Sequence, residues 1–279
     1  MDASNDSAAQ KKEIIKNKSD ILKPLDNTSL PRVQIANTRE LKVKAFRLLY
    51  ESYLEKGFAQ ESESKMWYSI FDLLPDTAIV VAINDEDEVV GALTIVLDSE
   101  IGLPADELCK GELEEFRKGH TLAQIASLCV KGKVRSDLGL LIKLCNYAFL
   151  YAKGLKSITD FIITVNPKNM NFYIQKLLFA QIGQEGLYSK LGGNPAVILQ
   201  LDLEEAELVS RQLRDEPSKH LYDQFYNVSE KKDDFDKLFE TKMSMNCSTE
   251  DFGYFVNQNC LMTKAVGKDG YTHNLMLSI

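Results

Sequence analysis

The sequence predicts a mixed α/β protein in which helices flank one twisted sheet. Two observations lead to this fold class. Residues 77–83 and 88–98 are apolar, rich in β-branched side chains, and flank the acidic turn "NDEDE", as in an antiparallel hairpin. Further along, residues 121–203 alternate between strand-like and helix-like patterns. Strands that come first as hairpins and then alternate with helices are typical of a mixed sheet.

The chain begins with a polar segment, a short strand and an amphipathic helix. Residues 1–30 are weakly periodic and rich in Ser, Asn, Lys and Asp, which predicts a mobile tail. A short strand is expected at 32–36. Asn37 and Glu40 then form a capping box for a helix that ends at Gly57.

The middle of the chain continues with a helix, a long strand and a second helix. Pro104 and Gly119 mark the start and the end of the first helix. Residues 121–130 alternate well enough to form a third long strand. A strongly apolar helix is then expected over 138–153, closed by Gly154.

The last part of the α/β pattern contains three more strands. Residues 157–165 form the first, and a helix that contains Phe172 follows it. The other two strands, 180–188 and 196–203, are separated by a Gly-Gly-Asn turn at 192–194. The chain beyond is charged and helix-biased. We therefore predict three parts: a flexible tail (1–30), an α/β domain (31–203) and a helical C-terminal extension (204–279).

Composition argues against several classes of protein. The net charge of −8 and the pI near 5.1 argue against a nucleic-acid binder, because phosphate contacts need a basic face. The five cysteines are odd in number and include no CxxC pair, which favours a reducing, cytoplasmic compartment and no structural metal. The N-terminus has no apolar leader core, and no apolar run is long enough to span a membrane.

A basic, glycine-containing turn follows the strand at 121–130. Lys131, Lys133 and Arg135 lie in this turn, "KGKVRSD", in an otherwise acidic chain. Because the turn opens a helix, its backbone N–H groups and the positive end of the helix dipole can hold a phosphate. The alternative is an ordinary basic surface turn, since the pattern alone is not specific.

Asn166 and Pro167 stand at the end of the strand at 157–165. Proline lacks the N–H donor that sheet pairing needs, so the chain leaves the sheet there and enters a helix. The space between this strand and the strand at 121–130 then opens into a cleft. Tyr173, nearly two turns into the helix, points either into that cleft or into the core.

An ordered set of motifs resembles a known enzyme family. The segments "GALTIVLDSEIGLP", "TLAQIASLCV", "ITVNPKNMNFYIQKLLF" and "GGNPAVILQLDL" follow one another as in the long-chain N-acyl amino acid synthases of the FeeM type. "RLLYESYLEKGF" is similar to the family's opening. That family has the GCN5-related N-acyltransferase fold and is related to the acyl-homoserine-lactone autoinducer synthases. The resemblance spans about residues 33–203.

The resemblance implies where a thioester binds. In this fold two neighbouring parallel strands splay apart, and the phosphopantetheine arm of coenzyme A or acyl carrier protein lies in the gap like an extra strand. The resemblance places the oxyanion donor among the backbone amides of Leu128, Cys129 and Val130. It assigns the phosphate to Lys131, Lys133, Arg135 and the helix-opening amides, including that of Gly139.

The resemblance also implies catalytic residues. Asn166 and Tyr173 have the fold's usual spacing, in which the tyrosine protonates the leaving thiolate. Gln124 stands where the family often has an acidic residue. Because glutamine cannot accept a proton, it either orients an amine or a water through hydrogen bonds, or is a polar residue satisfied inside the sheet. A water chain or Asp98 then removes the proton. The expected substrate-binding residues are Arg47, Asp98 and Ser127.

Three functional hypotheses follow. The first is an N-acyltransferase that moves a long acyl chain from acyl carrier protein or acyl-CoA directly to the amine of an amino acid or similar small molecule. It needs no permanently bound cofactor, and its partners are the carrier protein, the amine and, by peripheral contact, lipids. The second is a CoA-dependent acetyltransferase acting on a small polar amine, and the third is a catalytically silent acyl-carrier or lipid-binding module. Residues 204–279 either cap an acyl tunnel or form a dimer arm.

Overall fold

One seven-stranded sheet organises the protein, in a computed structural model that describes residues 31–131, 138–212, 225–226 and 247–259. The strand order is β1-β2-β3-β4-β5-β7-β6, and all neighbouring pairs are antiparallel except β4 and β5. The predicted mixed α/β class is therefore confirmed. The strands are β1 (Arg32–Ile35), β2 (Ala78–Ile83), β3 (Val89–Leu97), β4 (Leu122–Val130), β5 (Asp160–Val165), β6 (Ala180–Tyr188) and β7 (Asn194–Asp202).

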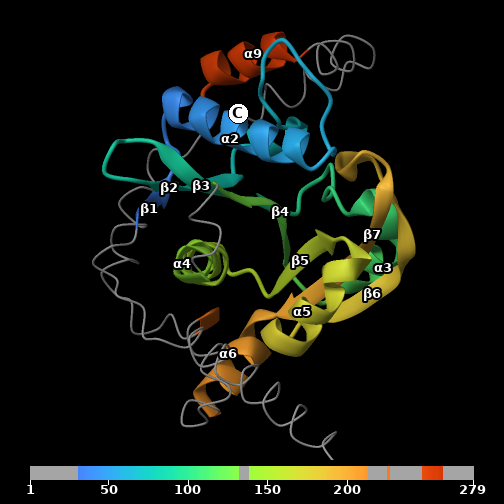
Figure 1. Cartoon of the computed structure of the whole chain (residues 1–279). Helices are drawn as coiled ribbons and strands as arrows, with labels where there is room; N and C mark the ends of the chain where they lie inside the picture. The colour runs from blue at the N-terminus through green and yellow to red at the C-terminus, as the bar shows by residue number, and fades with distance from the viewer. Residues whose placement is uncertain (1–30, 132–137, 213–224, 227–246, 260–279) are drawn as a thin grey trace, which may run out of the picture. The chain divides into compact units, whose positions relative to one another are not determined.

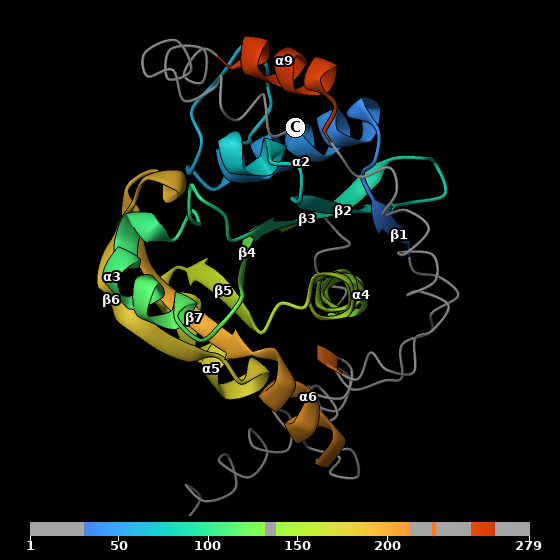
Figure 2. The same ribbon diagram turned by 180° about the vertical axis from the view of Figure 1, so that it is seen from behind.

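Helices cover both faces of the sheet. Figures 1 and 2 show α2 on one face with α9 lying over it, and α4 on the opposite face. The helices are α2 (Arg39–Glu55), α3 (Asp106–Arg117), α4 (Leu138–Phe149), α5 (Pro167–Leu177), α6 (Leu203–Gln212) and α9 (Thr249–Gln258). Shorter helical turns are η3 (Ile70–Leu73), η5 (Leu150–Leu155) and η6 (Ser189–Leu191).

The core on the α2 face joins the two ends of the described chain. Phe46 of α2 is fully buried and stacks on Tyr68 with ring centroids 4.7 Å apart. Phe255 of α9 meets the Phe46 ring edge-on at 5.3 Å. Apolar side chains of β2 and β3 lie beneath these rings. β2 is buried along its whole length. This packing explains why the hairpin sequence lacks a polar alternation.

The predicted cap of α2 is wrong. Thr38, and not Asn37, is the N-cap residue, and its side-chain oxygen accepts the N–H of Leu41 at 3.3 Å. Thr38 is the last residue with an extended backbone, so its hydroxyl is the one that reaches the first turn. Glu40 pairs instead with Lys44 one turn later, with 2.8 Å between Nζ and Oε1.

The predicted end of the apolar helix at Gly154 is also wrong. The chain continues from α4 through the π-helical turn η5 as far as Leu155. The residue with a left-handed backbone is Ser157, at φ 53°, and the reversal into β5 takes place there. Tyr151 is fully buried within η5, and its hydroxyl donates to the carbonyl of Asp76 at 2.8 Å.

The remaining predicted elements lie close to their expected positions, and the domain boundaries stay predictions. α6 begins at Leu203, beside the expected boundary between the α/β domain and the extension. The predicted tail, 1–30, lies outside the described residues. No helix in the described part of the chain is long and apolar enough to cross a membrane.

Candidate functional site

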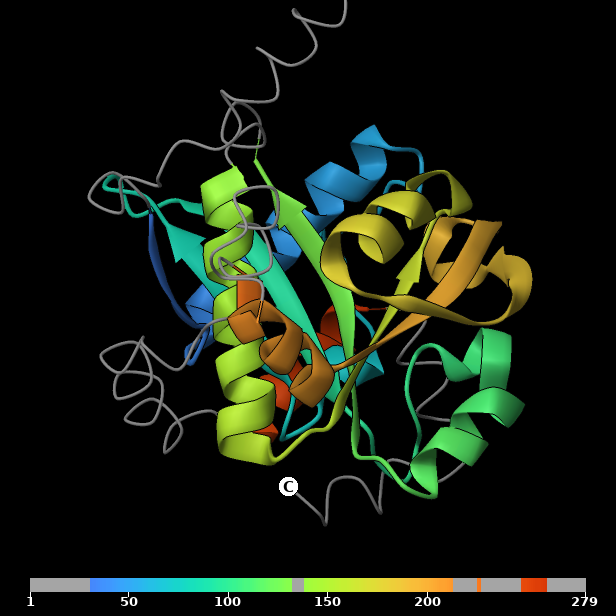
Figure 3. The same ribbon diagram turned by 90° about the horizontal axis from the view of Figure 1, so that it is seen from below.

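The parallel strands β4 and β5 pair over only part of their length. The register runs from Leu122↔Asp160 to Ile125↔Ile163 and stops there, although β4 continues to Val130. Figure 3 shows the two strands diverging beyond this point. Unpaired backbone groups therefore face each other across a gap at the carboxyl ends of both strands.

An irregularity in β4 lies at the start of the gap. On the β3 side, Thr94 pairs with Ser127 and Ile95 pairs with Ile125, so Ala126 is an extra residue opposite no partner. Such a bulge bends the strand that contains it and raises its local twist. β4 therefore turns away from β5 at the residue after their last pair.

Two backbone amides of β4 point into the gap. The N–H of Lys131 donates to the carbonyl of Val90 on β3 at 2.8 Å. Because antiparallel pairs alternate between bonded and non-bonded positions, Cys129 pairs with β3 in the same way. The amides of Leu128 and Val130 then face the other edge of β4, where β5 no longer pairs. They are positioned to hydrogen-bond an extended ligand or an oxyanion.

A cavity of about 410 Å³ occupies this gap. Its lining includes Tyr53 and Lys56 from the end of α2, and Cys145 and Phe149 from α4. Since α2 and α4 lie on opposite faces of the sheet, the cavity passes through the sheet between β4 and β5. Most of its other lining side chains are apolar: Phe58, Ile125, Phe161, Ile163, Leu177, Phe179, Leu191, Leu201 and Phe225.

Tyr173 lines the cavity from α5. Burial raises the pKa of its hydroxyl, with a smaller contribution from Cys145, so the phenol stays protonated at neutral pH. Its ring meets Phe179 edge-on, with centroids 5.8 Å apart. Among the described residues its hydroxyl receives or donates no hydrogen bond. Tyr173 is therefore a protonated acid facing the gap.

Asn166 also lines the cavity, but its side chain has a structural partner. Its Oδ1 accepts the N–H of Lys168 at 3.0 Å and caps α5, with Pro167 in the first turn. Proline preorganises that turn and removes an N–H that would otherwise lack a partner. The Asn-Pro pair thus ends β5 and starts the helix that carries Tyr173.

Gln124 is 1% exposed and does not line the cavity. Its Oε1 accepts the N–H of Ala105 at the start of α3 at 2.8 Å, and its Nε2 donates to Thr164 of β5 at 3.3 Å. Burial raises the pKa of the neighbouring Tyr188 hydroxyl, and the polar side chains of Gln124 and Thr164 partly oppose this rise. Thr164 itself lines the cavity, so Gln124 contacts the site through one intervening residue.

The three expected substrate-binding residues are not brought together. Ser127 lines the cavity, and its hydroxyl donates to Thr94 at 2.8 Å. Asp98 lies elsewhere, with both carboxylate oxygens accepting from Arg117 at 2.6 and 3.0 Å. Arg47 is exposed on α2 and is absent from the cavity lining. The cationic side chain in the described cavity lining is that of Lys56, which follows the last residue of α2.

The structure describes only the two ends of the expected phosphate-binding turn. Lys131 is half-exposed, and its Nζ lies 3.4 Å from the Glu88 carboxylate. Lys133 and Arg135 lie outside the described residues. Gly139 is buried in the first turn of α4. The Cys129 side chain is buried in the core on the α2 face and is absent from the cavity lining.

Sequence reasoning missed several lining residues. Lys56 and Phe58 flank Gly57, and in the sequence this glycine indicates only the end of a helix. Leu191 lies at the end of η6, just before the Gly-Gly-Asn turn, and no motif marks its own position. Phe225 and Tyr226 lie in the charged extension, where an aromatic pair within "YDQFYNV" was the available signal.

Comparisons with known proteins agree with this architecture. A family model described as N-acyl amino acid synthase FeeM matches residues 44–202. The solved structure of FeeM, an N-acyl amino acid synthase from uncultured soil microbes, is 25% identical with a TM-score of 0.54, covering 64% of this chain and 94% of that chain. The predicted resemblance to this family is confirmed.

Two further solved structures are more distant. A CoA-dependent acyl-homoserine lactone synthase, BjaI, solved with SAM and isopentyl-CoA, is 14% identical with a TM-score of 0.47, covering 70% of this chain and 89% of its own. An N-acetyltransferase from Staphylococcus aureus Mu50 is 13% identical with a TM-score of 0.42, covering 61% of this chain and 96% of its own. No curated protein matches the sequence.

Proposed function

This chain belongs to the FeeM family of N-acyl amino acid synthases, and from that premise we propose that it joins a long acyl chain to the amine of an amino acid. The family match over residues 44–202 makes the chain an acyltransferase enzyme. The thioester donor, the acyl chain and the acceptor amine are then assigned from the residues that line the cavity between β4 and β5 and from those near it.

The observation that carries the proposal is an apolar cavity at a gap between two parallel strands. The amides of Leu128 and Val130 face this gap, and an extended pantetheine arm has the amide groups to pair with them. A thioester held in this way lies beside Tyr173, which lines the same cavity. One of the two amides then donates to the carbonyl oxygen as negative charge develops on it.

The transfer is a direct aminolysis. The neutral amine attacks the thioester carbonyl, the C–N bond forms and the C–S bond breaks. Tyr173 gives its proton to the departing thiolate, and the proton lost by the nitrogen restores the phenol through water. Amide and free thiol are the products, so atoms and charges balance without an acyl-enzyme. The raised pKa of Tyr173 keeps the proton available at neutral pH.

The size of the cavity favours a long acyl chain over an acetyl group. A volume of about 410 Å³ lies within the range of sites that enclose drug-sized ligands, ~300–1,000 Å³. An acetyl group would leave most of this apolar volume empty. A longer chain instead buries its methylenes against Phe161, Ile163 and Phe149, at roughly 0.8 kcal/mol for each CH₂.

The charge of the cavity favours an acceptor with a carboxylate. Lys56 is the one charged side chain among the described lining residues, and its Nζ lies 5.8 Å from the ring centroid of Tyr53. We assign Lys56 to the carboxylate of an amino acid whose amine faces the thioester. A polyamine would instead meet a like charge there.

The donor is assigned as a phosphopantetheine thioester, which both acyl carrier protein and acyl-CoA provide. The basic turn after β4 favours the acidic carrier protein as its source, because a local patch is enough for electrostatic docking. We place the reaction in the cytoplasm, a reducing compartment in keeping with the free thiols of the four described cysteines.

The test is transfer by the purified protein with matched donors. Acetyl, octanoyl, dodecanoyl and hexadecanoyl thioesters, each on CoA and on carrier protein, are incubated with single amino acids and with their decarboxylated amines. Products are identified by mass spectrometry, because the cysteines of the protein interfere with thiol reagents. We expect long-chain N-acyl amino acids from wild type, and a raised KM for amino acids in Lys56→Ala. Decarboxylated amines should be unaffected by this substitution.

A catalytically silent acyl-binding module is the second candidate. It is favoured by one observation: the described cavity lining contains no Asp, Glu or His to remove a proton from an ammonium group. Tight binding of long-chain thioesters without turnover, at a pH where free amine is abundant, would establish this function. If the protein transferred only acetyl groups, and only to polyamines, both the long-chain synthase and the silent binding module would be excluded.

A further inference from the structure

The family match ends before two residues that line the cavity. The FeeM model covers residues 44–202, whereas Phe225 and Tyr226 come from the C-terminal extension. Both side chains are nearly inaccessible to solvent, at 2% and 4% exposed. An aromatic pair in a charged segment is buried in this way when it fills a specific apolar space.

The pair is held by two helices at once. The side-chain Nδ2 of Asn146 on α4 donates to the carbonyl of Phe225 at 2.6 Å. The hydroxyl of Tyr226 donates to the carbonyl of Leu177, the last residue of α5. Buried hydrogen bonds of this kind are costly to leave unmade. The backbone of Phe225 and the side chain of Tyr226 are therefore both anchored at this end of the cavity.

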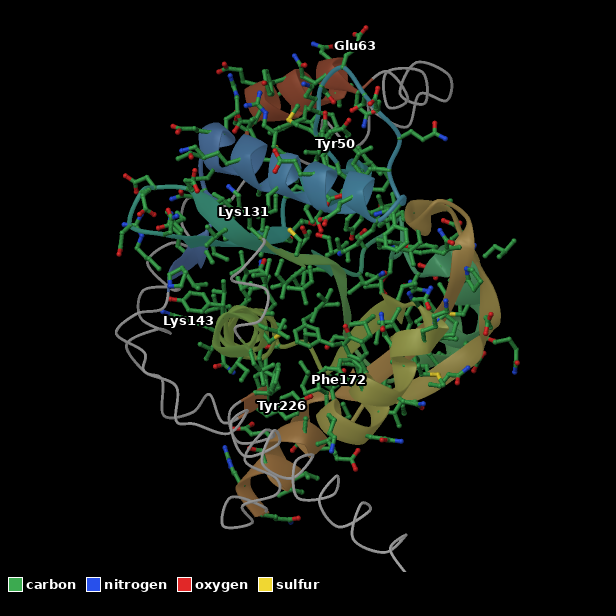
Figure 4. All side chains as sticks on the ribbon, in the orientation of Figure 1. Tyr50, Glu63, Lys131, Lys143, Phe172 and Tyr226 are labelled. Carbon is green, nitrogen blue, oxygen red and sulfur yellow. The ribbon has the colours of Figure 1, made fainter. Side chains whose placement is uncertain are left out.

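The pair lies at the end of the cavity away from α2. Figure 4 shows Tyr226 on the side of α4 opposite to α2. The Tyr226 ring packs against Phe149 of α4 with centroids 6.0 Å apart, and Phe149 is another lining residue. Lys56 and Phe58, by contrast, line the cavity from the α2 side. A chain that enters beside Lys56 and passes through the sheet ends against the aromatic pair.

We propose that Phe225 and Tyr226 form the floor of the acyl cavity and set the longest acyl chain that the enzyme accepts. This inference rests on the proposed acyl transfer, and it gives the C-terminal extension a role in substrate selection. An aromatic floor rejects a chain that is too long, since the Phe225 backbone and the Tyr226 hydroxyl are each held by a buried hydrogen bond and close packing resists movement of the rings. A single methylene in an apolar pocket changes selectivity by ~10–200-fold.

The experiment measures the acyl-length profile of two opposite variants. Phe225→Ala deepens the floor and should raise the preference for chains beyond the wild-type optimum by ~10-fold or more. Phe225→Trp raises the floor and should move the optimum to shorter chains. Phe252→Ala serves as the control, because Phe252 of α9 is fully buried but does not line the cavity. It should lower stability and leave the profile unchanged.

A second readout separates this inference from the proposed function. Binding of non-reactive acyl-pantetheine thioethers of graded length, followed by calorimetry, requires no turnover. Suppose that no amine is acylated, but that the acyl length bound most tightly shifts in opposite directions in Phe225→Ala and Phe225→Trp. The proposed transfer is then wrong, whereas the role of Phe225 and Tyr226 as the cavity floor is supported. Identical length profiles in wild type, Phe225→Ala and Phe225→Trp, in both transfer and binding, would overturn the floor. Tyr226→Phe, which removes the hydroxyl that donates to the Leu177 carbonyl, should broaden the profile.

Discussion

Tyr173 carries the most specific expectation at the scale of single residues. Tyr173→Phe removes the hydroxyl and keeps the ring that packs on Phe179. We expect kcat to fall by ~10²-fold, the lower end of what a positioned acid contributes. Binding of a non-reactive thioether should not change, because the ring remains. A variant with unchanged kcat would show that water protonates the thiolate.

The pH dependence of the reaction follows from the same residue. Burial raises the pKa of Tyr173, so the acid form persists at and beyond the ordinary tyrosine pKa, near 10. The amine must be neutral, so the rate should rise with pH as the acceptor loses its proton. It should fall only above the raised pKa of Tyr173, where the phenol ionises. In Tyr173→Phe that alkaline fall should be absent from the kcat profile.

Substitutions of Asn166 can distinguish a helix-capping role from a catalytic role. Its Oδ1 accepts a backbone N–H of α5, and aspartate reproduces this bond, whereas alanine does not. We expect Asn166→Ala to lower the free energy of unfolding by ~1 kcal/mol, measured by urea denaturation. Asn166→Asp should keep both stability and kcat. If Asn166→Asp is stable but inactive, the amide Nδ2 acts in the reaction.

Gln124 is expected to act on stability more than on chemistry. It links the start of α3 to Thr164 across β4, and it is 1% exposed. Gln124→Ala leaves the Ala105 N–H without its acceptor, so we expect a loss of ~1–3 kcal/mol of unfolding free energy. Gln124→Glu keeps an acceptor for that N–H and tests the family's usual acidic residue. A large gain in kcat in Gln124→Glu would show that this position controls proton removal.

At the scale of elements, patterns that depend on neighbours in sequence were predictable. The hairpin of β2 and β3, the long strand β4 and the Asn-Pro end of β5 follow from β-branched runs and turn residues. The cap at Thr38 was missed because Asn37 and Thr38 are both good caps, and the backbone decides between them. The parts of the site contributed by distant segments, such as Lys56 and Phe225, carry no local pattern.

The turn between η6 and β7 is an element whose geometry reaches the cavity. Gly192 has a left-handed backbone at φ 65°, and an added Cβ would lie 3.3 Å from the Phe58 carbonyl oxygen. Gly193 has a similar backbone, at φ 75°, but nothing lies within 4 Å of its added Cβ. Leu191 in the same turn and Phe58 both line the cavity.

Gly193 therefore serves as the control for substitution of Gly192. Gly193→Ala should cost only the backbone strain, ~1–2 kcal/mol of unfolding free energy. Gly192→Ala adds the contact with Phe58, so it should cost more and also raise the KM of the acyl donor. Denaturation and steady-state kinetics of both variants provide the check. Equal KM values in the two variants would show that the turn does not shape the cavity entrance.

At the scale of the whole molecule, the described ends of the chain converge on α2. Arg39, at its start, pairs with Asp251 of α9 at 2.6 Å and with Glu250 at 2.9 Å. Farther along α2, Phe46 meets Phe255 of α9, while Tyr53 and Lys56 line the cavity. One helix thus joins the packing of the C-terminal helix to the gap between β4 and β5.

This connection predicts that α9 stabilises the fold through its apolar face. Phe255 is fully buried between Phe46 and Tyr68, and the Tyr68 hydroxyl donates to its carbonyl at 2.7 Å. Phe255→Ala should lower the unfolding free energy by ~3–5 kcal/mol, as buried aromatic truncations do. Arg39→Ala should have a smaller effect that salt partly suppresses, because Arg39 and Glu250 are exposed even though Asp251 is mostly covered.

The same substitution tests whether α2 transmits this loss to the cavity. If α2 keeps its place on the sheet, Phe255→Ala should reduce stability without altering the acyl-length profile, since no side chain of α9 lines the cavity. The measurement is calorimetric binding of graded thioethers at a temperature where the variant remains folded. A weaker affinity at every chain length would show that α9 holds Tyr53 and Lys56 in position. The C-terminal extension would then influence both ends of the cavity, indirectly through the contact of α9 with α2 and directly through Phe225.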